Sequence, residues 1–458
     1  MPKRADAGFD RDNFGLLLIV IAALAVAAIT ISIAGLASLP MDKHEALVAR
    51  TSAEMLGRGD FVVPYFNAEP RLNKPPLSYW ATIAVHQIRA GSGAPLAIID
   101  ARIPSMAAML GIIFLVMRLA WQGAGRGAAL AAGAISIASP MLAYFSHDAR
   151  PDTLYAFLTF AGAAALASAL LKSGDQRDRR ATAGLAYLGW LLWGLATLAK
   201  GPHIPLMVAV GLFIFGAIEL SDWRAAWRRL RPLSGLALAA LVALPWWWLL
   251  QNRLDPQALA ASQLSGTLYQ PGLAALGKSY RELLGIGLLF PWFLLIPFHF
   301  REARALFRAS PVARLCIWVY LVPVALLLFS PQHRWHYMLP VVPFLAVFCA
   351  LLADRLMARR SFKTAFATAF TILALFLAAN AIFQWTWDDI RFARQQHLVP
   401  FSKPGLQEIP LAATPSIESA FQVFIATARR PVRLLETPAE VSAWQAEVES
   451  KCAIVLTT

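Results

Sequence analysis

The stretch that decides the fold class is the apolar run FGLLLIVIAALAVAAITISIAGLASL, residues 14–39. It carries no charged side chain, and it is longer than the roughly 20 residues that an α-helix needs to cross a bilayer. Lys3, Arg4 and Arg11 precede it, as basic residues precede a secretory signal peptide. Its length and the similar runs that follow favour a membrane anchor instead.

Similar apolar runs recur along the chain, about eleven in all when each is counted as one transmembrane helix. They lie at 14–39, 103–121, 127–145, 153–171, 183–199, 203–220, 233–250, 283–299, 312–329, 338–353 and 364–386. In lipid only helices and closed barrels satisfy their own backbone groups, and no run alternates as a barrel strand does. The sequence therefore predicts an all-α polytopic membrane protein.

The composition excludes the soluble alternatives. Of the 458 residues 58% are hydrophobic and 15% are charged, whereas soluble domains carry about 25% charged residues. Three cysteines make no disulfide framework, and we expect them to be inert thiols. The net charge of +14 would suit a nucleic-acid binder, but the positions of the basic residues give it another explanation.

Basic residues are concentrated in alternate loops, which sets the expected orientation. One side carries arginine-rich loops at 118–126, 172–180, 224–231, 301–314 and 355–363. The short loops of the other side hold only Arg150, Lys200, Arg253, Lys278, Arg281 and Arg334. We expect the arginine-rich side and the N-terminus to be cytoplasmic and the C-terminus to lie on the opposite side, without a nucleic-acid partner.

Two segments are too polar for the membrane. Residues 40–102 form a first outer loop, with a predicted amphipathic helix at 43–57 and a second at 77–89. We expect the second helix to lie in the membrane interface with Tyr79 and Trp80 as anchors. The chain thus divides into a membrane domain, 1–389, and a small non-cytoplasmic C-terminal domain, 390–458. That tail is expected to be α/β, with a helix at 438–450 and a strand at 453–456.

Acidic side chains and histidines gather in the outer loops, whereas the opposite loops carry plain arginine runs. The outer clusters are Asp42-Lys43-His44-Glu45, Asn73-Lys74, Ser146-His147-Asp148-Ala149-Arg150-Pro151-Asp152, Lys200-Gly201-Pro202-His203 and Gln332-His333-Arg334-Trp335-His336-Tyr337. Polar helix ends are common, but carboxylates and histidines on one face only favour a single site built from several helix ends.

Each cluster also has a structural explanation. Asp42 and Glu45, three residues apart, suit catalytic carboxylates on one helix face or acids that stabilise a first turn. Asp152 follows Pro151, as at many helix starts, yet an acid at membrane depth is also a functional candidate.

Lys74 and the pair His333 and His336 can likewise be read as functional or as structural residues. Lys74, held before two prolines, suits a phosphate ligand or a side chain that reaches the lipid headgroups. His333 and His336 have a spacing that metal ligands use, but without a third ligand we favour a role in the loop.

Taken together, these residues resemble a known family. The first outer loop reads HEALVARTSAEML at 44–56, GDFVVP at 59–64 and KPPLSYW at 74–80. Further matches follow in order: ARPD at 149–152, KGP at 200–202, LPW at 244–246, PW at 291–292, and YMLP at 337–340 with Pro343. The chain is similar to the aminoarabinose transferase and protein O-mannosyltransferase-like group. These are bacterial glycosyltransferases of the GT-C fold, which use polyprenyl-phosphate sugars. The tail is only loosely similar.

The resemblance implies a multi-pass enzyme of the bacterial inner membrane with its C-terminus in the periplasm. It would move a sugar from a polyprenyl-phosphate donor to a lipid, glycan or protein acceptor on the outer face, as in lipid A or glycan modification. The candidate catalytic residues are Asp42, His44, Glu45 and Asp152. The candidate substrate-binding residues are Lys74, Tyr79, Arg150, Lys200, Arg334, His336 and Tyr337.

One position departs from the family pattern. The group usually has Asp-Glu at the start of the first-loop helix, where this chain has His44-Glu45. The base is therefore either Asp42, two residues earlier, or His44, since imidazole titrates near neutral pH. Similarly, Arg334 or His333 stands where the group often has lysine.

The required chemistry fits these residue types. A base must take the acceptor proton, and positive groups or a metal must stabilise the departing lipid phosphate. Glu45 and Asp152 are the candidate ligands if a divalent metal takes part, and the sequence requires no other cofactor. No glycine-rich nucleotide-binding motif follows a strand, which favours a lipid-linked donor.

The main alternative is a lipid or sugar flippase or another transporter. Transporters place ionisable groups near the bilayer midplane and often contain internal repeats. Here the acids lie at outer helix ends, and the sequence shows no repeat. A noncatalytic scaffold would leave the outer carboxylates unexplained.

Overall fold

The computed structural model describes residues 41–91, 93–172, 176–220, 222–255, 284–329 and 334–358, together with short pieces of the C-terminal segment and isolated residues elsewhere. The pieces are 411–413, 432–435, 437–448 and 454–456. The described part is mostly helical, as predicted. The predicted spans at 14–39 and 364–386 lie outside the continuously described residues.

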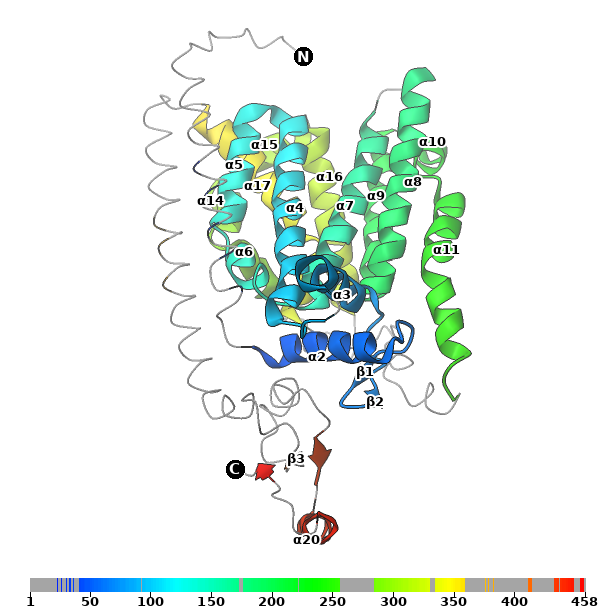
Figure 1. The fold of residues 1–458 in the computed structure, drawn as a ribbon. Helices are drawn as coiled ribbons and strands as arrows, with labels where there is room; N and C mark the ends of the chain where they lie inside the picture. The colour runs from blue at the N-terminus through cyan, green and yellow to red at the C-terminus, as the bar shows by residue number, and fades with distance from the viewer. Residues whose placement is uncertain are drawn as a thin grey trace.

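A bundle of apolar helices forms the body of the molecule (Figure 1). Its helices are α4 (Ile98–Ala124), α5 (Arg126–Ile137), α7 (Pro151–Leu171), α8 (Gln176–Ala199), α9 (His203–Glu219), α11 (Pro232–Gln251), α16 (Pro311–Leu327) and α17 (Val342–Met357). Within the described residues four helices are long and apolar enough to cross a membrane, in α4, α7, α8 and α11 with the preceding α10. A fifth candidate joins α15 to α16 through a bend of 109°. The chain is a multi-pass membrane protein.

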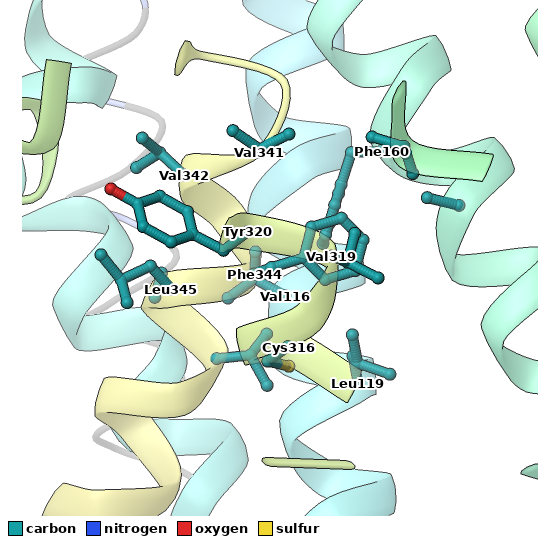
Figure 2. Packing of buried hydrophobic residues seen from close by; sticks show 14 of the residues in the cluster. Val116, Leu119, Phe160, Cys316, Val319, Tyr320, Val341, Val342, Phe344 and Leu345 are labelled. Carbon is teal, nitrogen blue, oxygen red and sulfur yellow. The ribbon is translucent and has the colours of Figure 1, made fainter. Parts of the chain in front are cut away.

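The core of the bundle lies where α4, α7, α16 and α17 meet (Figure 2). Val116 of α4, Phe160 of α7 and Val319 of α16 are buried there around Phe344 of α17. The Phe160 and Phe344 rings meet edge to face at 4.7 Å, a preferred aromatic geometry. These helices therefore form a fixed frame for the loops at their ends.

Two predicted spans are interrupted in the structure. The run 283–299 forms the 3-10 helices η3 (Leu284–Leu289) and η4 (Trp292–Leu294), then the short helix α14 (Leu295–Phe298). Glycines and prolines explain the breaks, because proline lacks the backbone donor that a continuous helix needs. For the same reason the run 127–145 divides into α5 and α6 (Pro140–Phe145).

The first outer loop lies across one end of the bundle (Figure 1). It consists of α2 (Lys43–Arg58), the hairpin β1 (Tyr65–Phe66) and β2 (Glu69–Pro70), and α3 (Leu77–Ala90). Both predicted loop helices are thus confirmed. The amphipathic helices α10 (Trp223–Leu230) and α15 (Phe300–Ala309) lie at the opposite end.

The described pieces of the C-terminal segment form a small α/β unit. Strands β3 (Leu411–Ala413), β4 (Arg433–Leu434) and β5 (Ile454–Leu456) make a parallel sheet in the order β4-β3-β5, accompanied by α20 (Pro438–Glu447). The segment also contacts the first outer loop. The Asn67 side chain donates to the Val432 carbonyl at 2.7 Å and accepts from the Val432 N–H at 2.8 Å.

Candidate active site

The predicted outer clusters come together at the end of the bundle that carries α2. Asp42 and His44 lie at the start of α2, while Arg150 and Asp152 lie at the start of α7. Lys200 directly follows α8, and the 3-10 helix η5 (Trp335–Met338) carries His336 and Tyr337. Helix ends far apart in the sequence thus supply one charged cluster, as the one-site interpretation predicted.

Asp152, Lys200 and His336 form the centre of this cluster. The Lys200 ammonium donates a hydrogen bond to Asp152 Oδ1, and His336 Nε2 lies 3.7 Å from the same oxygen. The Lys200 Nζ also sits 4.3 Å from the centroid of the Tyr337 ring, a cation–π distance. These four residues line a small pocket together with Tyr155 and His203.

Local backbone geometry fixes the two halves of the Asp152–Lys200 pair. Pro151 occupies the start of α7, where its missing N–H costs nothing and its fixed φ suits the helix. Gly201, with φ of 124°, lets the chain turn from α8 into α9 directly after Lys200. The charged pair is therefore built into the two helix ends.

Arg150, at the start of α7, connects the charged cluster to α2 through Asp42. Its Nη2 lies 3.4 Å from Asp42 Oδ2 and 3.3 Å from the Tyr144 hydroxyl, and its Nε lies 2.6 Å from Asp148 Oδ2. The side chain is only 10% exposed. Arg150 is thus a guanidinium held in place from two sides.

Lys74 adds a cation whose environment disfavours its charge. Burial and the nearby Lys200 lower the pKa of Lys74, Asp152 partly opposes them, and the net pKa is about 8. The ammonium therefore lies close enough to Lys200 and Asp152 to sense both charges. A phosphate group placed here would relieve the repulsion between the two lysines.

His44 lies within the same electrostatic neighbourhood. Burial lowers its pKa to about 4, and Arg150 lowers it as well, while Asp42 acts in the opposite sense. The imidazole is therefore neutral at pH 7. Within the described residues, neither of its ring nitrogens has a hydrogen-bond partner.

His336 is also held neutral. Burial lowers its pKa to about 3, against the opposing effect of Asp152. A neutral imidazole offers one donor and one acceptor to a substrate.

Asp42 both caps α2 and contributes to the charged cluster. Its Oδ1 accepts the His44 N–H at 2.6 Å, and Glu45 Oε2 accepts the Asp42 N–H at 2.9 Å, which completes a capping box. The helix thus begins at Asp42, which places this carboxylate beside Arg150.

Glu45 lies in a closed environment instead of an open pocket. It is fully buried, and Arg102 grips both of its oxygens at 2.7 and 2.8 Å. The Ala149 N–H and the Asp42 N–H complete its hydrogen bonds at 3.2 and 2.9 Å. This arrangement leaves Glu45 no acceptor capacity for a substrate or a metal ion.

Tyr79 does not anchor α3 in the interface as predicted. It is fully buried, and its hydroxyl accepts a hydrogen bond from Arg71. The apolar spacing of α3 is the same for a lipid-facing and a protein-facing stripe, which explains the error. Trp80 likewise points to protein and donates to the Phe61 carbonyl at 2.8 Å.

The described residues do not fit a metal centre. No group of three or more His, Cys, Asp or Glu side chains that could hold an ion occurs among them. Of the two ligands considered, Glu45 is saturated by hydrogen bonds and Asp152 is engaged by Lys200. No chemical step below depends on a metal. His333 lies outside the described residues.

Sequence reasoning missed two residues that organise the site. Arg102 directly precedes the apolar run 103–121 and forms a fully buried ion pair with Glu45, and a charge at the end of such a run is the sequence signal that could have found it. Tyr155, one turn after Asp152, accepts the Ile204 N–H at 3.2 Å and so ties α7 to α9.

The comparisons with known proteins agree with the predicted resemblance. No family model matches the chain. The chain is 28% identical over 327 residues to an undecaprenyl phosphate-alpha-4-amino-4-deoxy-L-arabinose arabinosyl transferase of Pseudomonas aeruginosa (strain LESB58), over 66% of this chain and 54% of the relative. An equally identical relative of the same description occurs in Pseudomonas paraeruginosa. The chain spans about half the length of these curated relatives.

Solved structures show the same fold. The crystal structure of ArnT from Cupriavidus metallidurans bound to undecaprenyl phosphate has a TM-score of 0.70 at 18% identity, covering 96% of this chain and 90% of ArnT. An Archaeoglobus fulgidus oligosaccharyltransferase has a TM-score of 0.52 at 13% identity, covering 92% and 65%. The predicted GT-C architecture is therefore confirmed.

Proposed function

We propose that this chain is a membrane glycosyltransferase, which moves a sugar from a polyprenyl-phosphate donor to an acceptor hydroxyl. The observation that carries the proposal is the convergence of Lys74, Lys200 and Arg150 around Asp152 at one end of the bundle. Cations at that depth suit a lipid-linked phosphate, whose prenyl chain the apolar helices would accommodate. Sequence similarity to the aminoarabinose transferases supports the same donor class.

In this proposal the cations serve the leaving group. The acceptor oxygen forms a bond to the anomeric carbon, and the bond between that carbon and the phosphate oxygen breaks. The departing prenyl phosphate keeps the electron pair, and Lys74 and Lys200 stabilise its charge. Arg150 and Arg334 add further positive charge. The charge of each acts on His336, and the charge of Arg334 also acts on Lys74.

We propose His44 as the base that accepts the acceptor proton. It is neutral at pH 7, and its ring nitrogens are not engaged by the described residues. The alternative base, Asp42, already receives the His44 N–H and faces Arg150, and both contacts reduce the basicity of a carboxylate. His44→Ala should lower kcat about 100- to 10,000-fold. His44→Asp, which restores the usual family residue, should remain active. Asp42→Asn should also remain active, because Asp42 is not the base in this proposal.

Glu45 would then position the site without touching the substrate. Its bonds to Arg102 and to the Ala149 N–H join α2 to the start of α4 and to the chain just before Arg150. Asp152 would hold Lys200 and His336 at the pocket.

The decisive test is sugar transfer by the purified full chain in detergent, with no second compartment. Undecaprenyl-phosphate aminoarabinose is the first donor to test, because the curated relatives are named for it. Lipid, glycan and protein acceptors are supplied separately, and mass spectrometry detects the product. Donor transport without transfer in vesicles would support a flippase and refute the proposal.

We propose that the site faces the periplasm of a bacterial inner membrane and that the end carrying α10 and α15 is cytoplasmic. The arginines of both helices support this orientation by the positive-inside rule. Gly57→Cys in α2 should react with an impermeant thiol reagent in spheroplasts, whereas Ala309→Cys in α15 should react only after permeabilisation. The reverse pattern would overturn the orientation.

A further inference from the structure

Helix α10 turns into α11 at the end of the bundle opposite α2 and the candidate active site (Figure 1). A recess lies at this turn. Only Arg231 separates the two helices. The recess has a volume of about 450 Å³ and is lined by Trp227, Arg228, Arg231, Pro232, Leu233 and Ser234. No carboxylate is among these lining residues.

The backbone at this turn is unusual. Arg231 has φ of 50° and ψ of 51°, a left-handed conformation that a residue with a Cβ rarely adopts. Such residues are concentrated at ligand-binding sites and persist only where their surroundings impose the conformation.

Neighbouring contacts impose this shape. The Trp190 indole donates to the Leu230 carbonyl at 2.8 Å. Gly235 packs on the same ring so closely that an added Cβ would lie 2.1 Å from it. The turn between α10 and α11 is therefore built against α8, and the recess is part of the fixed fold.

The arginines at the end of α10 and in the turn that follows have two different environments. Arg229 caps the end of α7, because its Nη1 donates to the Leu170 and Lys172 carbonyls at 2.7 and 2.6 Å. Arg228 and Arg231 instead line the recess. The Arg228 guanidinium lies 3.9 Å from Asp222, and because the arginine is 76% exposed this contact contributes little.

Arg231 has a neutral partner. Its Nη1 donates to the Tyr187 hydroxyl at 3.3 Å. The two guanidinium groups therefore bring positive charge to the recess without a close carboxylate inside it.

Large apolar side chains surround these arginines. Trp223, Trp227 and Leu233 are 56%, 40% and 71% exposed. Tryptophan beside arginine at the end of a membrane helix is typical of the boundary between lipid headgroups and acyl chains. The recess thus lies at the depth of the headgroups.

We propose that this recess binds the phosphate headgroup of an anionic phospholipid in the leaflet opposite the candidate active site. Guanidinium groups bind phosphate through paired hydrogen bonds. No side chain caps the start of α11, and Pro232 has no N–H, so Leu233 and Ser234 carry the first backbone N–H groups of a helix end that favours anions. The exposed Trp223 and Leu233 would contact the acyl chains, which a soluble phosphate lacks.

The test is native mass spectrometry of the delipidated full chain in detergent, titrated with dioctanoyl phosphatidylglycerol. The wild-type chain should show one saturable lipid adduct. Arg228→Gln with Arg231→Gly should weaken this adduct about 30-fold, since each arginine near a lipid headgroup contributes about fivefold. Glycine is chosen at 231 because it adopts the left-handed conformation without strain.

The matched control is Arg224→Gln, which removes an exposed arginine of the same helix that does not line the recess. It should leave the adduct unchanged. Dioctanoyl phosphatidylcholine tests the charge of the headgroup, and glycerol 1-phosphate tests the need for acyl chains. Size-exclusion chromatography verifies folding. If the double variant does not fold, Arg228→Gln alone replaces it and should weaken the adduct about fivefold.

Three outcomes would overturn the proposal. They are equal phosphatidylglycerol binding by the wild type and the double variant, equal binding of phosphatidylcholine, and displacement of the lipid by glycerol 1-phosphate at similar concentration. The last result would identify a soluble phosphate site.

Discussion

Two carboxylate–cation pairs, Glu45–Arg102 and Asp152–Lys200, lie at the same end of the bundle but in different surroundings. Glu45 and Arg102 are both fully buried, and protein donors satisfy every oxygen of the carboxylate. Asp152 and Lys200 remain 11% and 6% exposed and line a pocket with two imidazoles. Protein groups saturate the first pair, while the second lines a small pocket.

The difference shows that burial of a charged pair does not by itself identify a catalytic group. What distinguishes the two pairs is the surplus charge around them. Lys74 and Lys200 both lie near Asp152, so two lysines share this one carboxylate at the pocket. Around Glu45 the single charge of Arg102 balances the carboxylate, and backbone groups supply the remaining contacts.

The largest expected effect is a loss of stability when the buried Glu45–Arg102 pair is broken. Glu45→Gln would leave the Arg102 charge buried without its counter-ion, which typically costs about 3–5 kcal/mol. Thermal unfolding of the purified protein in detergent should therefore show a much lower melting temperature. Arg50→Gln, which breaks the Arg50–Glu54 pair on the same helix, is the control and should have a smaller effect. Unchanged stability of Glu45→Gln would contradict the assignment of Glu45 as a structural anchor.

The Asp152–Lys200 pair should respond in the opposite way. Asp152→Asn releases Lys200 and His336 from their common partner, and misplacement of substrate ligands by about 1 Å can cost 100-fold in rate. We therefore expect kcat/KM to fall by about that factor while the melting temperature changes little. Asp60→Asn, whose partner Arg253 is 54% exposed, provides a carboxylate control in the same outer region. A large loss of stability with normal turnover would mean that both pairs are structural.

The third prediction concerns the surplus charge. Lys74→Gln should raise KM for the polyprenyl-phosphate donor about tenfold, the value of one charge-assisted contact, with a smaller change in Lys74→Arg. Lys43→Gln is the control, because Lys43 is exposed on α2. Arg89 is unsuitable for this purpose, since it pairs with the buried Asp100. Identical KM values in the Lys74 and Lys43 variants would leave only a lipid-anchoring role for Lys74.

The charge of Lys74 also predicts a pH dependence. Burial and Lys200 place its pKa at about 8 in the donor-free protein, so the ammonium is present below this pH and lost above it. Donor kcat/KM should thus fall as the pH rises through 8, because this parameter reports free-enzyme groups. Lys74→Arg should shift the fall to higher pH, since arginine stays protonated. The same profile in both proteins would assign the titration to another group.

The smallest effect is expected at the contact between the outer loop and the C-terminal segment. Asn67→Ala removes two hydrogen bonds to Val432, worth about 1 kcal/mol each. Limited proteolysis of the C-terminal segment should become faster, with little change in transfer by the membrane domain. Asn252→Ala, whose amide contacts only its own helix end at Trp248, is the control. Equal protection in both variants would show that the contact is incidental.

The sequence predicted the bounds of helices well where a regular apolar spacing was not interrupted. The bounds 43–57 and 77–89 were close to those of α2 and α3, because capping residues and apolar spacing agree there. The run 283–299 failed as a single span, since hydropathy does not register the interruptions by Gly285 and Pro291. The small sheet of the tail could be predicted only as one strand.

The sequence predicted candidate catalytic and substrate-binding residues, but it did not separate the carboxylates that hold the fold from those that line the pocket. The one-sided distribution of acids and histidines correctly brought Asp152, Lys200 and His336 together. The pattern did not distinguish Glu45 from Asp152, because the partner of Glu45 lies 57 residues away at Arg102. Long-range partners decide whether a carboxylate is saturated, and a single sequence does not reveal them.

The capping box of α2 has a consequence for which insertions and deletions the chain tolerates. Asp42 and Glu45 define the rotation of α2 about its axis, and one added or lost residue between them would turn the helix by roughly 100°. Glu45 would then leave Arg102, and Asp42 would leave Arg150. After Gly59, by contrast, the chain has left the helix, so a change in length beyond this residue would not turn α2. Homologues should therefore keep a constant spacing from residue 42 to residue 45.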